Sequence, residues 1–189
     1  SGIRLTASAS LVPIGTCLSS TWNDDLVEEL YSLVGQEMIL NGSDVILAPG
    51  MNILRDPLCG RNFEYFSEDP LLTGRMGSSY VKGVQSQGVS ACPKHFALNN
   101  QETNRNYNDS RCSERAQREI YLKAFEICVK EARPLNLMTS YNKVNGEWAY
   151  YNYEIMKTIL RDEWGYDGVL MTDWWIREDT CDYMDNTWN

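Results

Sequence analysis

Short apolar runs alternate along the chain with longer stretches in which apolar and polar residues recur at helical spacing. The apolar runs predict buried strands at 44–48, 89–92, 135–139 and 168–172. The longer stretches predict helices over about 23–40, 71–87, 113–133 and 153–164. In the third helix, Leu122, Phe125 and Val129 form one apolar stripe, and Ser113 precedes it as a candidate N-cap.

This alternation predicts right-handed β-α-β units and a parallel sheet, which places the chain in the α/β class. Such a sheet is either open and doubly wound or closed as an eight-stranded barrel. No Gly-rich dinucleotide or P-loop motif is present, and each polar motif follows a different strand, which favours the barrel. A complete barrel takes about 250 residues, so the 189 residues predict a (β/α)8 TIM-type barrel that is only partly present, with about four or five βα units.

Composition narrows the classes of partner. A hydrophobic content of 43% in 189 residues is enough for one sizeable core, so one domain is expected. The net charge of -9 argues against nucleic acid or an anionic membrane surface as a partner, whereas neutral sugars fit. No apolar run is long enough to span a bilayer, and residues 1–4 lack the features of a secretion signal. A cytoplasmic location is weakly favoured, but the missing initiator methionine leaves secretion open.

The cysteines and the single histidine argue against a metal centre. The six cysteines are Cys17, Cys59, Cys92, Cys112, Cys128 and Cys181. Their spacing contains no C-x-x-C pair, which excludes a zinc knuckle and a redox pair of that type. Reduced thiols are favoured over three disulfides, because Cys92 and Cys128 fall in predicted core segments. With His95 as the only histidine, we expect neither a catalytic metal nor a cofactor.

Asp173 is the strongest candidate for chemistry. It follows the apolar strand at 168–172 and precedes Trp174 and Trp175, so it is delivered to the carboxyl edge of the sheet among aromatic rings. A carboxylate in such surroundings can attack an electrophilic carbon or stabilise a cationic transition state. The alternative is an aspartate that ends the strand and caps the next turn.

Four segments in the same order carry a resemblance to a known family. They are 60–70 (GRNFEYFSEDP), 94–105 (KHFALNNQETNR), 138–146 (MTSYNKVNG) and 168–175 (GVLMTDWW). Together they resemble the N-terminal barrel domain of a glycoside hydrolase family 3 β-glucosidase, over about residues 2–175. The resemblance implies a retaining hydrolase that removes a terminal non-reducing β-linked sugar, foremost glucose, without metal or cofactor and with Asp173 as nucleophile.

The same resemblance implies a longer protein. Family members continue from the barrel into an α/β sandwich domain that supplies the acid/base glutamate. Residues 1–189 are therefore expected to be a partial catalytic barrel domain with the C-terminal sandwich domain absent from this chain. The fragment alone is expected to be inactive, because general acid assistance is typically worth 10²–10⁴-fold.

The resemblance also assigns substrate contacts, each with a structural alternative. Lys94 and His95 emerge together at a strand end and can both donate to hydroxyls of one sugar ring. A structural histidine and a lysine that reaches to solvent are the alternatives. Arg61 matches an arginine that holds a sugar hydroxyl, and its alternative is an ion pair with Glu64 or Glu68.

Three further contacts follow from the matched motifs. Met138 is expected against the sugar, with core packing as its alternative. The Tyr141 hydroxyl is expected near the nucleophile, where it can keep a carboxylate ionised. Trp174 is expected to form an apolar platform for the sugar, although one residue of the Trp174–Trp175 pair is expected in core or interdomain packing. Ion pairs that support the mouth of the barrel are expected of Arg4, Arg55, Glu102 and Arg105.

A rival hypothesis from another class remains. The 189 residues could form a non-catalytic carbohydrate-binding or structural fragment of such an enzyme. A family branch that acts on N-acetylglucosaminides uses a histidine–aspartate pair in a loop, which the single His95 of the Lys-His segment does not supply. Turnover of an aryl β-glucoside by the complete gene product, as opposed to binding without turnover, separates the enzyme from its rival.

Overall fold

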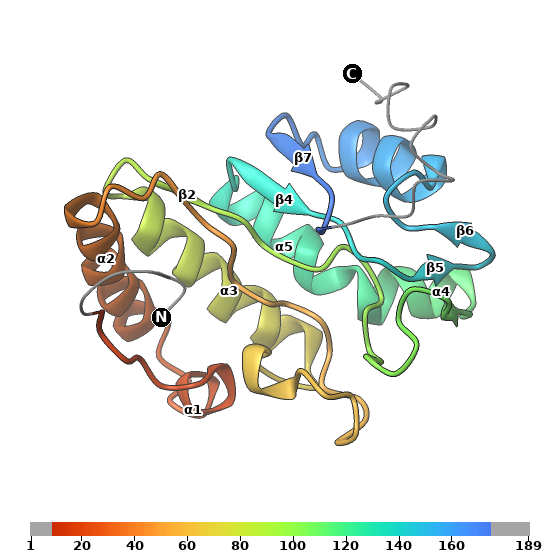
Figure 1. The fold of residues 1–189 in the computed structure, drawn as a ribbon, viewed down its shortest axis with the longest axis horizontal. Helices are drawn as coiled ribbons and strands as arrows, with labels where there is room; N and C mark the ends of the chain where they lie inside the picture. The colour runs from red at the N-terminus through yellow and green to blue at the C-terminus, as the bar shows by residue number, and fades with distance from the viewer. Residues whose placement is uncertain (1–8, 175–189) are drawn as a thin grey trace.

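The computed structural model describes residues 9–174, and its strands and helices alternate as the apolar pattern predicts. The helices are α1 (Gly15–Ser19), α2 (Asp24–Leu40), η1 (Asn62–Glu64), α3 (Pro70–Gln85), α4 (Glu114–Ala116), η2 (Gln117–Tyr121), α5 (Lys123–Ala132) and η3 (Glu154–Glu163). The strands are β1 (Val45–Ile46), β2 (Ser90–Ala91), β3 (Asp109–Ser110), β4 (Asn136–Met138), β5 (Lys143–Val144), β6 (Glu147–Trp148) and β7 (Val169–Met171). The long helices lie along one side of the strands (Figure 1).

Polar side chains fix where the long helices begin. The Asn23 side chain accepts a hydrogen bond from the Leu26 amide at 3.0 Å and caps α2. Asp69 caps α3 through two amides, and Pro70 occupies the first turn, where its missing N–H leaves no bond unmade. Ser113 accepts from the Ala116 amide at 3.2 Å, so the predicted cap is confirmed.

The third and fourth predicted helices differ from regular α-helices. The predicted helix 113–133 is divided into α4, η2 and α5, because the Leu122 amide donates to the Gln117 carbonyl five residues back at 2.8 Å. The predicted helix 153–164 is wound mainly as the π-helix η3. The apolar stripe is nevertheless confirmed, since Leu122, Phe125 and Val129 are all buried.

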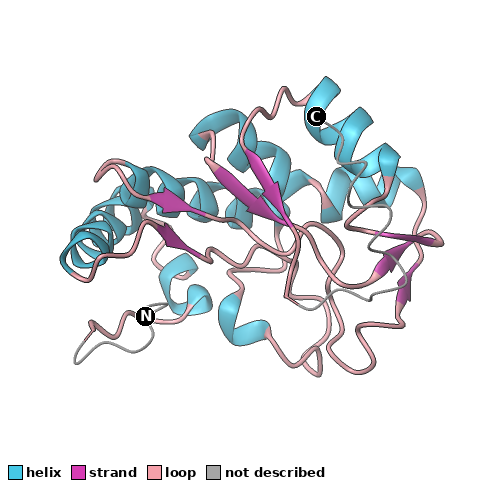
Figure 2. Cartoon of the chain, turned by 45° about the horizontal axis from the view of Figure 1, so that its top comes forward, coloured by secondary structure: helices cyan, strands magenta, loops and turns pink. Residues whose placement is uncertain are grey.

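The central strands are parallel and follow one another in chain order. β1 pairs with β2, and β4 pairs with β7. A parallel bridge between Phe96 and Thr139 joins the β2 side to the β4 side. The α/β class is thus confirmed, and each regular strand is shorter than its predicted run. Figure 2 shows the strands between the helical layer and the loops.

A small second sheet was not predicted. β3 pairs in parallel with β5, and β5 forms a hairpin with β6 around Asn145 and Gly146. Both turn residues have positive φ, of 51° and 100°, as a tight two-residue hairpin turn requires. Strands of two residues give no alternation to read, so only the Asn-Gly pair signalled this hairpin.

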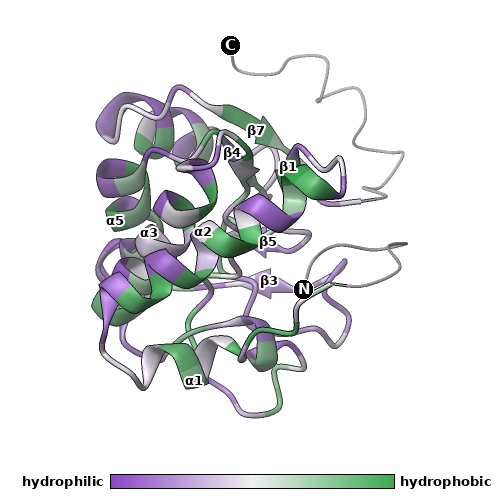
Figure 3. Cartoon of the chain, turned by 90° about the vertical axis from the view of Figure 1, so that its left-hand side faces the viewer, coloured by the Kyte–Doolittle hydropathy of each residue, from purple (hydrophilic) through white to green (hydrophobic). Residues whose placement is uncertain are grey.

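The core lies between the strands and the helical layer. β7 is coloured as apolar in Figure 3, while α2 and α3 alternate polar and apolar stretches along their length. α2 and α3 approach so closely at Gly83 that a Cβ there would lie 2.3 Å from the Glu28 carbonyl oxygen.

Cys92 and Cys128 are buried, and all five cysteines within the described residues are free thiols; Cys181 lies outside them. Within residues 9–174, no helix combines the length and apolarity needed to cross a membrane.

Candidate active site

Polar side chains from four loops meet where the parallel strands end. Asp173 follows β7 by two residues, and His95 lies four residues beyond β2. Their side chains approach to 3.8 Å between His95 Nε2 and Asp173 Oδ2. Tyr141 lies three residues beyond β4; burial raises the pKa of its phenol, and the nearby Asp173 charge raises that pKa further. The sequence-predicted nucleophile is therefore surrounded by two of the predicted binding residues.

Asp173 is held in place and largely shielded from solvent. Its side chain is 12% exposed, and its Oδ1 accepts a hydrogen bond from the Trp174 amide at 2.8 Å. That local bond is of the kind expected of a strand-ending aspartate, so both readings of Asp173 find support in the geometry. The second carboxylate oxygen faces His95, which a simple cap does not require.

His95 is a buried, neutral imidazole. The Asn52 side chain bonds both the His95 amide and the His95 carbonyl at 3.0 Å, which fixes the backbone there. Burial lowers the pKa of His95 well below its ordinary value of 6.5, and the cations Arg61, Lys94 and Arg105 lower it further. The ring therefore carries one proton at neutral pH.

Arg61 and Lys94 share one carboxylate. Glu64 accepts three hydrogen bonds from the Arg61 guanidinium, the shortest at 2.7 Å, and lies 3.3 Å from Lys94 Nζ. Burial opposes the charge on Arg61, but Glu64 outweighs it and the pKa of Arg61 is raised. The structure thus contains the Arg61–Glu64 ion pair that was the structural alternative for Arg61. Glu64 holds both Arg61 and Lys94 at the strand ends. Arg61 Nη1 also lies 3.8 Å from Glu102.

The supporting ion pairs are only partly as predicted. Arg105 bonds Glu102 at 2.7 Å within the cluster, as expected. Arg55 does not form an ion pair at the mouth of the barrel. It is exposed and donates to the Tyr121 hydroxyl at 2.9 Å, because the loop that carries it turns outward against η2. Arg4 lies outside the described residues.

Tyr141 is packed beneath a cation. The Arg105 guanidinium lies 4.6 Å from the Tyr141 ring centroid, and the residue is 8% exposed. Burial and then Asp173 raise the pKa of Tyr141, against the opposing effect of Arg105 and Arg61. Its hydroxyl therefore stays protonated at neutral pH and is available as a donor.

The remaining predicted contacts differ in exposure. Met138 is 2% exposed at the end of β4, which agrees with its core-packing alternative. Trp174 is 60% exposed beside Asp173, as a platform at an open mouth requires. Trp175 lies outside the described residues.

Sequence reasoning missed three buried polar residues beside His95. Asn52 holds its backbone, Tyr65 is fully buried with its hydroxyl 3.5 Å from His95 Nδ1, and Asn99 links Tyr65 to Glu102. Tyr65 and Asn99 lie inside two of the matched segments, which was the only signal available.

One hollow lies elsewhere. It measures about 150 Å³ and is lined by residues that include Arg55, Asn100, Asp109, Arg111 and Tyr121, and Asp173 is not among its lining residues. The charged cluster, not this hollow, is the candidate active site because it gathers polar groups from several strand ends. Within residues 9–174 no group of three His, Cys, Asp or Glu side chains is placed to hold a metal ion.

Comparison with known proteins places the chain in a family. Residues 1–187 match the model of the glycosyl hydrolase family 3 N terminal domain. The chain belongs to glycosyl hydrolase family 3. A β-glucosidase from Ruminococcus albus is 52% identical over 177 residues, which cover 93% of this chain and 19% of that protein. An exo-α-(1→6)-L-arabinopyranosidase from Bifidobacterium longum is 49% identical over 166 residues, 88% of this chain and 22% of that protein.

A solved family 3 structure has the same fold. β-Glucosidase 3B from Thermotoga neapolitana, in complex with glucose, matches with a TM-score of 0.90 and 50% identity, over 98% of this chain and 26% of that chain. This family 3 chain therefore spans about a fifth to a quarter of the length of these relatives.

Proposed function

We propose that this family 3 chain is the nucleophile-bearing part of a retaining glycoside hydrolase that removes a terminal non-reducing β-linked sugar. The observation that carries the proposal is the position of Asp173, at a strand end, 12% exposed and 3.8 Å from a neutral imidazole. A carboxylate at a strand end with hydrogen-bond donors around it is placed to attack an anomeric carbon. The family relatives named as β-glucosidases support this reaction class.

The reaction proceeds in two balanced displacements. An Asp173 oxygen attacks the anomeric carbon as the glycosidic C–O bond breaks, and a general acid gives its proton to the leaving oxygen. The acid, now a base, then takes a proton from water, whose oxygen displaces Asp173 and restores the free carboxylate. We assign the acid/base to a segment of the enzyme outside these 189 residues.

The cluster around Asp173 binds the sugar in this proposal. Lys94 and His95 donate to neighbouring hydroxyls, and Tyr141 donates to Asp173. Glu64 holds the cations at the strand ends, so Arg61 reaches the sugar with those of its N–H groups that Glu64 does not occupy.

Met138 and Trp174 complete the binding site. Trp174, which is 60% exposed, covers an apolar sugar face. Met138 lies beneath the sugar as part of the floor, consistent with its burial.

The rest of the architecture is proposed from the order of the strands. Consecutive parallel pairing of β1 with β2 and of β4 with β7, with helices on one side, is typical of part of a (β/α)8 barrel. We propose that further strands complete the barrel and that a sandwich domain follows it.

The substrate proposed first is a β-glucoside. The Thermotoga neapolitana relative holds glucose, while the Bifidobacterium longum relative is named for an arabinopyranoside. Glucose and arabinopyranose are both pyranoses, so a pyranose in the first subsite fits the donors at Lys94 and His95, and the aglycone side is set by segments beyond this chain.

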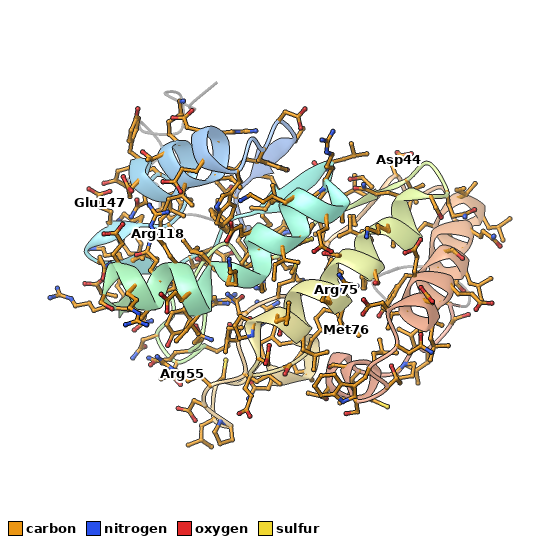
Figure 4. The ribbon with its side chains drawn as sticks, turned by 180° about the vertical axis from the view of Figure 1, so that it is seen from behind. Asp44, Arg55, Arg75, Met76, Arg118 and Glu147 are labelled. Carbon is orange, nitrogen blue, oxygen red and sulfur yellow. The ribbon has the colours of Figure 1, made fainter. Side chains whose placement is uncertain are left out.

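Replacing the nucleophile tests the function. In the complete protein, Asp173→Ala is expected to abolish turnover of an aryl β-glucoside while glucose still binds, and azide is expected to restore turnover and give the α-glycosyl azide. Asp44→Ala is the control: Asp44 is exposed at the opposite end of β1, away from the strand-end loops (Figure 4). Full activity of Asp173→Ala, or sugar binding without turnover by the parent protein, would reject the proposal; the second outcome would favour the non-catalytic rival.

A further inference from the structure

A row of buried polar side chains extends from the protein interior to Asp173. Tyr65 Oη lies 3.5 Å from His95 Nδ1. The other ring nitrogen, Nε2, faces Asp173. Asn99 Nδ2 lies 3.5 Å from the same phenol oxygen. Tyr65, His95 and Asn99 are each at most 2% exposed, so their polar atoms depend on protein partners rather than water, and within the described residues Asn99 Oδ1 has none.

The proton of His95 belongs on Nε2. The imidazole is neutral, because burial and neighbouring cations lower the pKa of His95, and so it has one donor and one acceptor nitrogen. Nε2 faces the Asp173 carboxylate, which only accepts. An unprotonated Nε2 would set two acceptors against each other at 3.8 Å.

Nδ1 is then a buried acceptor that needs a donor. Burial raises the pKa of Tyr65 far above its ordinary value of 10.0, so its hydroxyl keeps its proton. The hydroxyl has a second acceptor within reach, the Asn99 carbonyl oxygen at 3.4 Å. Donation to that carbonyl would leave Nδ1 without its partner, which is unfavourable for a buried acceptor.

Asn99 and Glu102 determine in which direction the hydrogen bonds of this row run. Asn99 Nδ2 lies 3.2 Å from Glu102 Oε1, and because a carboxylate only accepts, the amide nitrogen must face it. The same nitrogen donates to Tyr65 Oη, which fills a lone pair of the phenol oxygen. The phenol proton is thereby free to point to His95.

We propose that Tyr65 is a positioning residue that holds His95 in the Nε2–H tautomer, so that the imidazole presents its one N–H on the side of Asp173 and the sugar. Asn99 donates to Tyr65 and Tyr65 donates to His95, whose Nε2–H then faces the carboxylate 3.8 Å away. The inference rests on the proposed function for the role of Asp173, but the tautomer itself can be observed without catalysis.

Neutron diffraction from crystals of the complete, sugar-free protein in D2O at neutral pH reads the protons directly. Deuterium is expected on His95 Nε2 and on Tyr65 Oη, directed at Nδ1. Deuterium on Nδ1, or a Tyr65 hydroxyl directed at the Asn99 carbonyl, would overturn the proposal. Neither outcome depends on which residue is the nucleophile, so this test and that of the proposed function fail separately.

The Tyr65→Phe variant measures what the tautomer contributes. Loss of one buried donor is expected to lower kcat/KM by about 3- to 10-fold and to spread deuterium over both ring nitrogens. Tyr80→Phe is the matched control, because Tyr80 is a buried tyrosine of α3 that contacts Tyr31. It should leave kcat/KM and the His95 deuterium unchanged. Equal kcat/KM in the two variants, with deuterium still on Nε2 alone, would show that Tyr65 does not set the tautomer.

Discussion

Two clusters of ion pairs in this molecule differ in burial. The mouth cluster is Arg61, Glu64, Lys94, Glu102 and Arg105 together with Asp173 and the neutral His95, and the helix cluster is Arg118 with Glu114, Glu154 and Glu163. Side chains of the mouth cluster are 2% to 31% exposed, and those of the helix cluster are 33% to 79% exposed. Figure 4 shows Arg118 on the outer, helical side.

The difference in burial determines what each cluster can do. Around Arg118, carboxylates from its own helical segment and from η3 bind one cation in water. They raise the pKa of Arg118, and the Arg118 hydrogen bond lowers the pKa of Glu163. In the mouth cluster, burial lowers the pKa of His95 and the shielded cations around it lower that pKa further. Shielded charges interact through a lower effective dielectric, which makes them useful for chemistry and costly to disturb.

The largest difference is expected when one cation is removed from each cluster. In the complete protein, Arg61→Met should lower kcat/KM for an aryl β-glucoside by about 10²-fold, because a positioned donor is lost and Glu64 is left without its main partner. Arg118→Met should leave kcat/KM within about threefold. Steady-state kinetics on both variants checks this, and equal losses would erase the distinction between the clusters.

A second substitution separates catalysis from stability at Arg61. Glu64→Gln in the Arg61→Met background should recover part of the lost unfolding free energy, since the unpaired charge is gone, but not the lost kcat/KM. Recovery of activity would mean that Arg61 acts only by neutralising Glu64.

The pH dependence of stability should come from the mouth cluster near pH 6. The folded-state pKa of His95 lies below its unfolded value of 6.5, so the unfolded chain binds the extra proton first as pH falls. Its contribution is complete above pH 6.5 and is lost on acidification, with a slope of at most about 1.4 kcal/mol per pH unit. Denaturant unfolding between pH 7 and 5 should show a shallower slope for His95→Gln; parallel slopes would contradict a neutral buried imidazole.

The smallest effect is expected in the helix cluster. Arg118→Met should cost about 0.2–1 kcal/mol of unfolding free energy, because Arg118 is a third exposed and its ion pairs are screened by solvent. The cost should shrink further in 1 M salt. A loss of several kcal/mol that persists in high salt would show that this cluster is not a solvated one.

The parts of the fold that the sequence predicts are those specified by local signals. The long helices α2 and α3 are predicted to within about two residues because their periodicity is a local signal; the caps at Asn23 and Asp69 are seen only in the structure. The β3–β5–β6 sheet was missed because its two-residue strands depend on pairing between distant segments.

The candidate site divides in the same way. Asp173 and His95 follow apolar strands, so their meeting at one sheet edge could be predicted from strand order. Tyr65 and Asn99 lie in loops, and only tertiary folding brings their side chains to the far side of the His95 ring. The Arg61–Glu64 ion pair could be named only as an alternative, because a motif does not say which of two partners a guanidinium contacts.

Covalent trapping of the nucleophile tests the central claim most directly. An activated 2-fluoro β-glucoside should label the complete protein, and peptide mapping by mass spectrometry should place the sugar on Asp173, with no labelling of Asp173→Ala. The same reagent should still label Arg118→Met. A sugar found on another carboxylate, such as Glu102 or Asp179, would contradict the assignment of Asp173 even though the chain belongs to glycosyl hydrolase family 3.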